Sequence, residues 1–395
     1  MLTDKEDMVH LKSHQQLKEN KEMKTIVISA VNLVEAGTLA ILKDCLTYLS
    51  QLNAQQQYRI IAIVYKKELV NMPNIEYIET QWPKKRWINR LWYEYVSMKK
   101  ISKDIGPVYL WFSLHDTSPT VIAEKTAVYC HNSFSFYNWS MRDLLFAPKI
   151  ALFAIFTKYI YKTNIHKNDF LVVQQDWFRK AMSDMFNIPV SHIIVAPPAK
   201  SDLEVLRIAK PNERYSFLFA GSPNSHKNFE IICQAVEQLI TKEAIDQFDV
   251  YITVKGDENK YAKWLYKRWG TRFKNIHFIG FITKNELLGY YARCQCLIFP
   301  SKVETWGLPI SEFAAYNKPM LLADLPYTKE TAGGSQQVAF FDPNDASTLA
   351  MHMTSLIQGD QTRLSPVTPT TIASPVAYDW SSLFQILLAS NTTTK

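Results

Sequence analysis

The sequence has few glycines, few cysteines and no long apolar run. Its 395 residues include 11 glycines and five cysteines, which excludes collagen-like chains and disulfide frameworks. The scattered cysteines predict buried, reduced thiols. Cys294 and Cys296 lack the second Cys or His pair that a zinc site requires. The longest lipid-like run, 150–156, is far shorter than the about 20 apolar residues that span a bilayer.

Several common active-site signatures are also absent. The chain has no G-x-G-x-x-G, no G-x-x-x-x-G-K-[ST], no G-x-S-x-G and no H-E-x-x-H, which argues against dehydrogenases, P-loop ATPases and the familiar hydrolases. It also lacks Asp-x-Asp, the usual metal clamp for a nucleoside diphosphate. Residues 1–23 are polar and do not resemble a secretory signal, so we expect a cytoplasmic protein.

Short β-branched runs alternate with helical patterns, which predicts βαβ units on parallel sheets. In the first half we predict strands at 25–30, 60–65, 108–112, 127–130, 170–173 and 193–196, and helices at 38–52, 88–101, 144–161 and 176–186. In the second half we predict strands at 217–220, 251–254, 276–279, 297–299, 320–322 and 338–341, and helices at 228–239, 261–273, 284–294, 309–316 and 346–357. Thr283 and Glu286 predict a capping box.

A stretch rich in proline and charge separates the two halves. We predict a polar lead at 1–23, a Rossmann-like domain at 24–200, a linker at 201–213, a second Rossmann-like domain at 214–360 and a tail at 361–395. The last helix of the tail, 380–388, is expected to pack on the first domain. The predicted fold class is therefore α/β, with two doubly wound domains facing a cleft. Ligands of such sheets bind at the carboxyl ends of the strands.

One candidate anion site follows the first strand of the second half. Gly221 would make a sharp turn there, and Lys227 lies at the mouth of the next helix. In this arrangement backbone amides and a lysine converge on an anion. A solvated lysine at an ordinary strand–helix junction is the alternative.

The segment 301–312 holds a second candidate. Gly307 and Leu308 would present amides at a helix start, and Glu304 and Glu312 could both accept hydrogen bonds from sugar or ribose hydroxyls. Acidic residues near a helix start also favour the helix dipole, but Glu312 lies too far into the helix for that explanation.

The E-x7-E spacing of Glu304 and Glu312 resembles the donor-site signature of retaining, two-domain (GT-B) glycosyltransferases of family 4. The surrounding motifs occur in a similar order: Gly221…Lys227-Asn228, Lys255-Gly256-Asp257, Phe278-Ile279-Gly280-Phe281 and Phe341-Asp342-Pro343. The resemblance is close over 214–360 and weaker but continuous from 24 to 200. It implies a hexosyltransferase that moves a sugar from a nucleotide-sugar donor to a glycan acceptor, as in bacterial O-antigen or capsule assembly.

The resemblance also implies a role for each matching residue. Lys227 would bind the donor diphosphate, Glu304 would contact the donor sugar as a catalytic residue, and Glu312 would bind the ribose. The other implied donor-binding positions are Gly221, Gly280, Phe281, Gly307 and Leu308. Retention of configuration and metal independence are implied as well, because Lys227 and helix amides would stabilise the departing diphosphate. No cofactor is then expected besides the nucleoside-diphosphate sugar, which is a co-substrate.

One position departs from the family pattern. Members usually have arginine directly after the glycine, where this chain has Ser222. The diphosphate then loses one of two cationic partners, and the candidates to replace it are His226 and Arg293. Reduced activity, or a binding protein without activity, is the alternative.

The first half offers softer matches. Gly37 is the one glycine left where the family has a glycine-rich loop near the donor phosphate and the acceptor. His131, directly after a predicted strand, resembles the histidine that lies beside the reacting sugar, and we predict it to be catalytic. His115 also ends a predicted strand and competes with His131 for this role.

The net charge of +7 is confined to the first half, where residues 1–200 hold 25 basic and 18 acidic side chains. The segment 84–93 packs four cations and three aromatics into ten residues, a pattern typical of helices that lie in anionic headgroups. The residues we expect to face the membrane are Lys84, Lys85, Arg86, Trp87, Arg90 and Trp92. The stretch 144–162 is also amphipathic, but burial against the sheet explains it better.

Two rival functions remain open. The segment 84–93 could bind nucleic acid, although no nucleic-acid module appears and the second half is neutral. A nucleotide-sugar epimerase on the same fold is the other, because fold alone does not fix the chemistry. The favoured interpretation is a peripheral enzyme on the inner face of the plasma membrane that uses a lipid-linked glycan acceptor and binds no nucleic acid.

Overall fold

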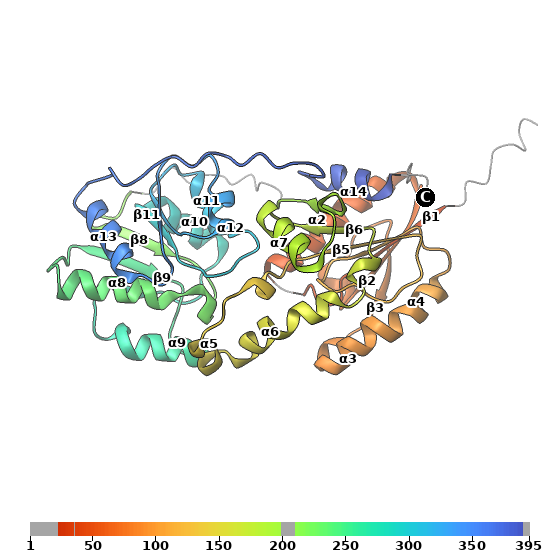
Figure 1. Cartoon of the computed structure of the whole chain (residues 1–395), viewed down its shortest axis with the longest axis horizontal. Helices are drawn as coiled ribbons and strands as arrows, with labels where there is room; N and C mark the ends of the chain where they lie inside the picture. The colour runs from red at the N-terminus through yellow and green to blue at the C-terminus, as the bar shows by residue number, and fades with distance from the viewer. Residues whose placement is uncertain (1–22, 35, 199–209, 390–395) are drawn as a thin grey trace, which may run out of the picture. The chain divides into compact units, whose positions relative to one another are not determined.

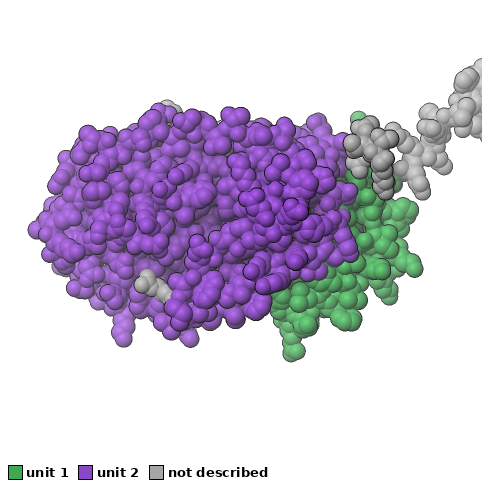
Figure 2. All heavy atoms as spheres, viewed as in Figure 1, with its two compact units in different colours: residues 1–128 green, residues 129–395 purple. Residues whose placement is uncertain are grey.

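The computed structural model describes residues 23–34, 36–198 and 210–389. The predicted polar lead and most of the predicted linker lie outside these residues. The chain divides into two compact units, residues 1–128 and 129–395 (Figure 2). The boundary falls inside strand β5 (Lys125–Tyr129), so the second unit carries the end of the first sheet and all of the second.

The first sheet has seven strands in the order β3-β2-β1-β4-β5-β6-β7. Their bounds are β1 Lys24–Ser29, β2 Tyr58–Val64, β3 Glu76–Glu79, β4 Leu110–Ser113, β5 Lys125–Tyr129, β6 Phe170–Val173 and β7 Ile193–Val195. The pairing is parallel, with Ile26 of β1 opposite Ile60 of β2 and Leu110 of β4. Central strands of such a sheet are covered on both faces, which explains their continuous apolar sequence.

The second sheet has six strands in the order β10-β9-β8-β11-β12-β13. Their bounds are β8 Tyr215–Phe219, β9 Phe248–Ile252, β10 Ile276–Phe278, β11 Cys296–Phe299, β12 Met320–Ala323 and β13 Val338–Phe341. This is the 3-2-1-4-5-6 order of the Rossmann fold, and the first six strands of the first sheet repeat it. The predicted α/β class with two Rossmann-like sheets is confirmed.

Helices of unit 2 cover its sheets (Figure 1). α8 (Phe229–Thr241) packs beside α13 (Ala346–Ile357). The other helices that follow strands of the second sheet are α9 Lys260–Leu265, α10 Lys284–Arg293, α11 Leu308–Ala314 and α12 Pro326–Thr331. The predicted capping box is present at α10, where Thr283 and Glu286 bond each other's backbone N–H groups.

Three predicted helices are interrupted. The prediction 261–273 covers α9 and a π-helical turn (Tyr266–Gly270). The prediction 88–101 covers α3 (Trp87–Trp92), a π-helical turn (Tyr93–Ser97) and α4 (Met98–Ile105). The prediction 144–161 covers α5 (Met141–Phe146) and α6 (Pro148–Lys162), which break at Ala147. Ala147 has φ −141° and ψ 57° because a residue before proline is disfavoured in the helical region. α2 (Ala36–Leu52) and α7 (Asp176–Phe186) lie close to their predicted ranges.

Two elements were not predicted. β3 reads EYIE and has no apolar run, as suits a short edge strand, and α12 begins with a proline after the short strand β12. All five cysteines are free and buried, as predicted. Among the described residues, no helix is both long enough and apolar enough to cross a bilayer.

The tail of unit 2 returns to the first sheet. Val376 pairs with Val195 at the end of β7, and Arg179 of α7 donates to the carbonyl of Ala373 at 2.7 Å. The final helix, α14 (Trp380–Leu388), is capped by Asp379. The ring of Trp380 lies edge-on to the ring of Tyr129, with 6.3 Å between the two centroids. The tail therefore packs beside strands β5 and β7 within this unit.

Candidate functional site

The candidate site begins at the carboxyl end of β8, where the chain turns at Gly221. The N–H of Gly221 donates to Thr253 Oγ1 (2.8 Å), and that hydroxyl donates to the Gly221 carbonyl (2.7 Å). A Cβ at Gly221 would lie 3.6 Å from Lys227 Cδ. Thr253, which follows β9, thus fixes the turn, and the lysine stem packs within ordinary contact distance of Gly221.

Lys227 and Glu304 form an ion pair at this edge of the sheet. Lys227 ends a short 3₁₀ turn before α8, and Glu304 lies in the loop between β11 and α11. Lys227 Nζ is 2.5 Å from Glu304 Oε1, and the two side chains are 16% and 17% exposed. The lysine is oriented by Asn228, whose left-handed φ of 60° turns the chain into α8 and whose amide donates to the carbonyls of Pro300 and Pro343. A charge pair this shielded from water acts on a ligand more strongly than exposed charges do.

Glu312 lies in α11 and is 8% exposed. Lys284 donates to its Oε1, and the Tyr291 hydroxyl donates to its Oε2 at 3.0 Å. Both partners lie on α10, so two helices hold the carboxylate in place. Burial, and next the charge of Glu312, raise the pKa of Tyr291 well above its usual value, which keeps this hydroxyl a donor.

The turn that starts α11 depends on glycine. Gly307 has a φ of +87°, a left-handed conformation that strains other residues, and its Cβ would lie 3.3 Å from Ile310 Cδ1. Leu308, the first residue of α11, is 45% exposed.

The loop after β10 carries the predicted base-side residues. Gly280 has a φ of +71°, and its N–H donates to the Val254 carbonyl at 3.2 Å. The side chain of Phe281 is 92% exposed. An aromatic ring in this position is available to stack on a base.

Residues 204–367 match the family model described as Glycosyl transferases group 1. This range holds Lys227, Glu304, Glu312 and the glycine turns. This part of the chain is therefore similar to a glycosyl transferases group 1 domain. It is also 26% identical over 207 residues to O-antigen chain mannosyltransferase B of Escherichia coli, a match that covers 49% of this chain and 52% of that one. The chain thus matches about half the length of this curated relative.

Solved structures share the fold across both sheets. A sucrose-phosphate synthase from Thermosynechococcus elongatus gives a TM-score of 0.63 at 13% identity, covering 85% of this chain and 90% of that one. A glycosyltransferase from Rickettsia africae gives 0.59 at 17% identity, covering 86% and 90%. The lipopolysaccharide outer core galactosyltransferase WaaB gives 0.58 at 12% identity, covering 86% and 92%. The TM-scores show that the chain shares the GT-B fold. At such low identity they say nothing about its substrate.

His131 lies just after β5, in unit 2 with the group 1 domain. Its ring lies 4.2 Å from that of Tyr129, and both ring nitrogens are shielded from water. The segment that follows packs against the lysine and glutamate loops: Phe134 lies edge-on to His226 at 5.0 Å, and Tyr137 clusters with Val303. The strand and turn therefore bring His131 and the Lys227–Glu304 loops into one packed unit.

His115 lies in unit 1 and is 2% exposed. Its Nε2 lies 2.9 Å from Ser29 Oγ, and its Nδ1 lies 3.0 Å from Thr117 Oγ1 and 3.3 Å from Glu94 Oε1. Partners at both ring nitrogens are typical of a histidine that holds strand ends together.

The suggested substitutes for the missing arginine are wrong. His226 is buried, and desolvation followed by the charge of Lys227 lowers its pKa to about 3, so the ring is neutral near pH 7. Arg293 ends α10 just before β11, at the opposite edge of the sheet from the loops, with its guanidinium 4.8 Å from the Tyr290 ring. Ser222 itself accepts from the Asn224 amide at 2.9 Å. Neither His226 nor Arg293 therefore adds a second cation beside Lys227 at the β8 turn.

The remaining predicted residues lie in unit 1. Gly37 is the second residue of α2, an exposed helical position with open space around it rather than part of a glycine-rich loop. Lys84, Lys85 and Arg86 are exposed, and Trp87 and Trp92 are 51% and 60% exposed.

Arg90 departs from its predicted place among the membrane-facing cations. It is partly buried, and its guanidinium donates to the His115 carbonyl at 3.0 Å. The helix turns this one cation inward, a difference that composition alone could not reveal.

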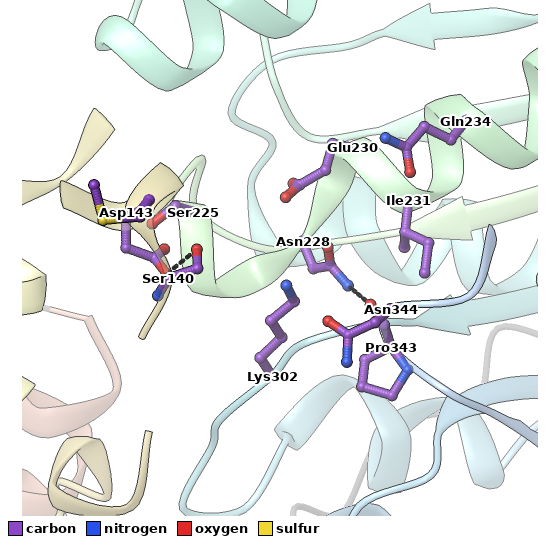
Figure 3. A pocket seen from close by; sticks show the side chains of 11 residues that line it. Ser140, Asp143, Ser225, Asn228, Glu230, Ile231, Gln234, Lys302, Pro343 and Asn344 are labelled. Atoms are coloured by element: carbon purple, nitrogen blue, oxygen red, sulfur yellow. Dashed lines mark hydrogen bonds between the residues drawn. The ribbon is translucent and has the colours of Figure 1, made fainter. Parts of the chain in front are cut away.

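Unit 2 also holds a polar pocket of about 410 Å³ (Figure 3). Its lining comes from the start of α5, the start of α8 and the loops after β11 and β13, including Ser225, Asn228 and Lys302. Asp143 on its wall accepts from the N–H and hydroxyl of Ser140 at 2.7 and 2.8 Å, which caps α5. Lys227, Glu304 and Glu312 are not among the residues that line this pocket.

Some site residues escaped the sequence analysis. Lys284 and Tyr291 hold Glu312, and Thr253 holds Gly221, from segments that are distant in sequence. Only the position of Thr253 at a strand end gave a signal. Among the described residues, no group of three His, Cys, Asp or Glu side chains could hold a metal ion.

Proposed function

We propose that this chain is a retaining glycosyltransferase that moves a sugar from a nucleoside-diphosphate donor to a glycan acceptor. The observation that carries the proposal is the shielded Lys227–Glu304 pair at the carboxyl edge of the second sheet, inside a group 1 domain. The proposed pathway is the assembly of a bacterial surface polysaccharide such as O-antigen or capsule. The likeness to an O-antigen chain mannosyltransferase supports it.

The residues at this edge suit the chemistry of donor cleavage. Negative charge builds on the departing diphosphate as the sugar becomes oxocarbenium-like. Lys227 would stabilise that charge, and the amides at Gly307 and Leu308 would add to it. Glu304 keeps the lysine in place and would contact the sugar, and Glu312 would accept from the ribose hydroxyls.

His131 is the proposed catalytic residue contributed by the first sheet. Its loop packs through Phe134 and Tyr137 against the neighbours of Lys227 and Glu304. A hydrogen-bond donor or acceptor at this point would orient the sugar. The diphosphate leaving group needs no general acid. Because Lys227 and the helix amides would stabilise its charge, we propose a metal-independent reaction with no resident cofactor.

A donor panel tests the proposal. The purified protein is incubated with GDP-, UDP- and dTDP-sugars, with and without a glycan acceptor, and the release of nucleoside diphosphate is measured. We expect one donor to be consumed, and NMR of the product to show the anomeric configuration of the donor. Conversion of a donor to another nucleotide sugar without acceptor would indicate an epimerase instead.

The proposed location is peripheral, at the inner face of the membrane that carries a lipid-linked acceptor. Support comes from the exposed cations Lys84, Lys85 and Arg86 beside the exposed rings of Trp87 and Trp92. Cations with aromatic rings suit anionic headgroups.

Changing Lys84, Lys85 and Arg86 to Glu should weaken retention on anionic vesicles, because three attractions become repulsions. Sedimentation with phosphatidylglycerol vesicles measures this, with Lys242, Lys260 and Lys274 changed to Glu as a control in unit 2. Equal retention of the two triple variants would contradict the proposed contact.

A further inference from the structure

Helices α5 and α6, which follow one another in unit 2 (Figure 1), carry a row of exposed apolar side chains. Met141 is 77% exposed, Leu145 68%, Leu152 50%, Phe156 54% and Tyr159 57%. Met141 and Leu145 lie four residues apart in α5, and Leu152, Phe156 and Tyr159 follow exposed Pro148 in α6 at spacings of four and three residues. Within each of the two helices this is the spacing of one face.

The buried face of α6 holds three small side chains and, at its end, the ring of Tyr161, which is 2% exposed. Ala151 is fully buried, and Ala154 and Thr157 are 6% and 3% exposed. A helix that only packs on a core buries its largest apolar residues, whereas α6 presents Leu152 and Phe156 to solvent. The prediction that burial explains the stretch 144–162 is therefore wrong for the outward row. Contiguous exposed apolar surface of this kind marks an interaction site.

The charge around this row is mainly positive. Residues 141–168 contain four lysines, one arginine and a single acidic residue, Asp143, which is buried in the cap of α5. Lys158 and Lys162 are exposed beside the row, and Lys158 Nζ lies over the Tyr159 ring at 5.0 Å from its centroid. Lysine stems that lie along apolar surface while their charged ends reach outward are typical of helices at a bilayer surface.

We infer that the row formed by Met141, Leu145, Leu152, Phe156 and Tyr159 docks into an anionic lipid surface. α6 lies in the plane of the headgroups, with its apolar row entering the lipid and its lysines bonding to lipid phosphates. A protein partner fits less well, because protein interfaces are depleted in lysine. Charge complementarity selects anionic over neutral lipid.

This surface deepens the proposed membrane association, on which it rests for its biological setting. It belongs to unit 2, whereas the segment 84–92 belongs to unit 1. It also uses none of the proposed donor-site residues. Donor turnover without vesicles therefore reports the proposed glycosyltransferase function, and vesicle binding reports the surface.

The test is vesicle sedimentation of the full chain carrying Leu152→Gln and Phe156→Gln. With phosphatidylglycerol–phosphatidylcholine vesicles we expect at least about a tenfold loss of partitioning, because the variant loses apolar burial in lipid. The segment 84–92 is untouched, so the loss reports α6 alone. The unmodified protein should partition at least tenfold less onto pure phosphatidylcholine.

A matched control carries Val190→Gln and Tyr378→Gln. These side chains are 50% and 64% exposed, and they lie in the same unit outside the row. The control should bind vesicles as the unmodified protein does. Hydrogen exchange should slow over 148–162 when anionic vesicles are added. Thermal unfolding and donor turnover without vesicles should be unchanged in both variants, since every substituted side chain faces solvent.

Two results would overturn the inference. One is equal vesicle partitioning of the row variant and the control. The other is a concentration-dependent dimer, seen by analytical ultracentrifugation without lipid, that the row variant abolishes, since the row would then cover a second copy of the chain.

Discussion

At the residue scale, the sequence marks the charged groups of the site but not what holds them. The spacing of Glu304 and Glu312 stands out in the sequence. The hydrogen bonds to Glu312 come from Lys284 and Tyr291 on another helix and become visible only once α10 packs beside α11. The neutral state of His226 follows from burial, which a single sequence does not record.

Phe281 carries the first prediction. Its side chain is 92% exposed beside Gly280, so it adds little to stability. If the ring stacks on the donor base, Phe281→Ala should raise the donor KM about tenfold, because stacking on an aromatic ring contributes about 1–3 kcal/mol per base. Phe281→Tyr should keep the KM. Initial rates over a donor concentration series measure both, and an unchanged KM in Phe281→Ala would remove this residue from the donor site.

Glu94 predicts a pH dependence of stability. Desolvation raises its pKa to about 8 from an ordinary value of 4.5, although Arg90 and Thr117 oppose the shift. Between these values the unfolded chain loses the proton that the folded chain retains, so stability falls as pH rises. Between pH 5.5 and 8, the free energy of unfolding of the unmodified protein should drop by about 1–3 kcal/mol more than that of Glu94→Gln. Urea unfolding at both pH values measures it. Parallel pH profiles of the two proteins would contradict the assignment.

At the scale of elements, local signals determine how well a helix is predicted. α7 and α13 match their predicted ranges, since polar residues begin them and apolar periodicity fills them. The break at Ala147 follows from Pro148, because a residue before proline is disfavoured in the helical region. The π-helical turn at Tyr93–Ser97 arises where Tyr93 and Glu94 are buried, a tertiary effect that periodicity does not encode.

A clasp between α7 and α12 gives the next prediction. Both oxygens of Glu330 accept from the start of α7, from the N–H of Asp176 at 2.6 Å and of Trp177 at 3.0 Å. Glu330→Ala leaves these N–H groups without partners and should cost about 1–2 kcal/mol of unfolding free energy. Urea unfolding measures this, with Glu213→Ala, at an 89% exposed side chain, as the control. Equal midpoints would show that the clasp does not stabilise the fold.

At the scale of the whole molecule, alternation of strands and helices was enough to predict two Rossmann-like sheets. The right-handed crossover rule limits the possible strand orders, and the structure shows which order each sheet adopts. The division at residue 128 was not foreseen. It arises because the tail and the contacts of α5 and α7 join the end of the first sheet to the second. Such contacts between distant segments leave no local trace in sequence.

The structure also shows where basic side chains of the first half lie. Some are exposed beside Trp87 and Trp92, one is turned inward at Arg90, and others flank the outward row of α5 and α6. Net charge alone distinguishes none of these. At the carboxyl edge of the second sheet, in contrast, the charges are balanced, because Lys227 pairs with Glu304 and Lys284 pairs with Glu312.

The most direct test of the central claim is the turnover of the cognate nucleotide sugar by Glu304→Ala, with Glu213→Ala as an exposed control. Glu304 lies in the loop between β11 and α11 and outside the hydrophobic core, so its loss should leave the fold intact, as circular dichroism and thermal unfolding would verify. The account predicts that the rate of nucleoside diphosphate release falls at least about 100-fold in Glu304→Ala and stays unchanged in the control. Full turnover by a folded Glu304→Ala protein would contradict it.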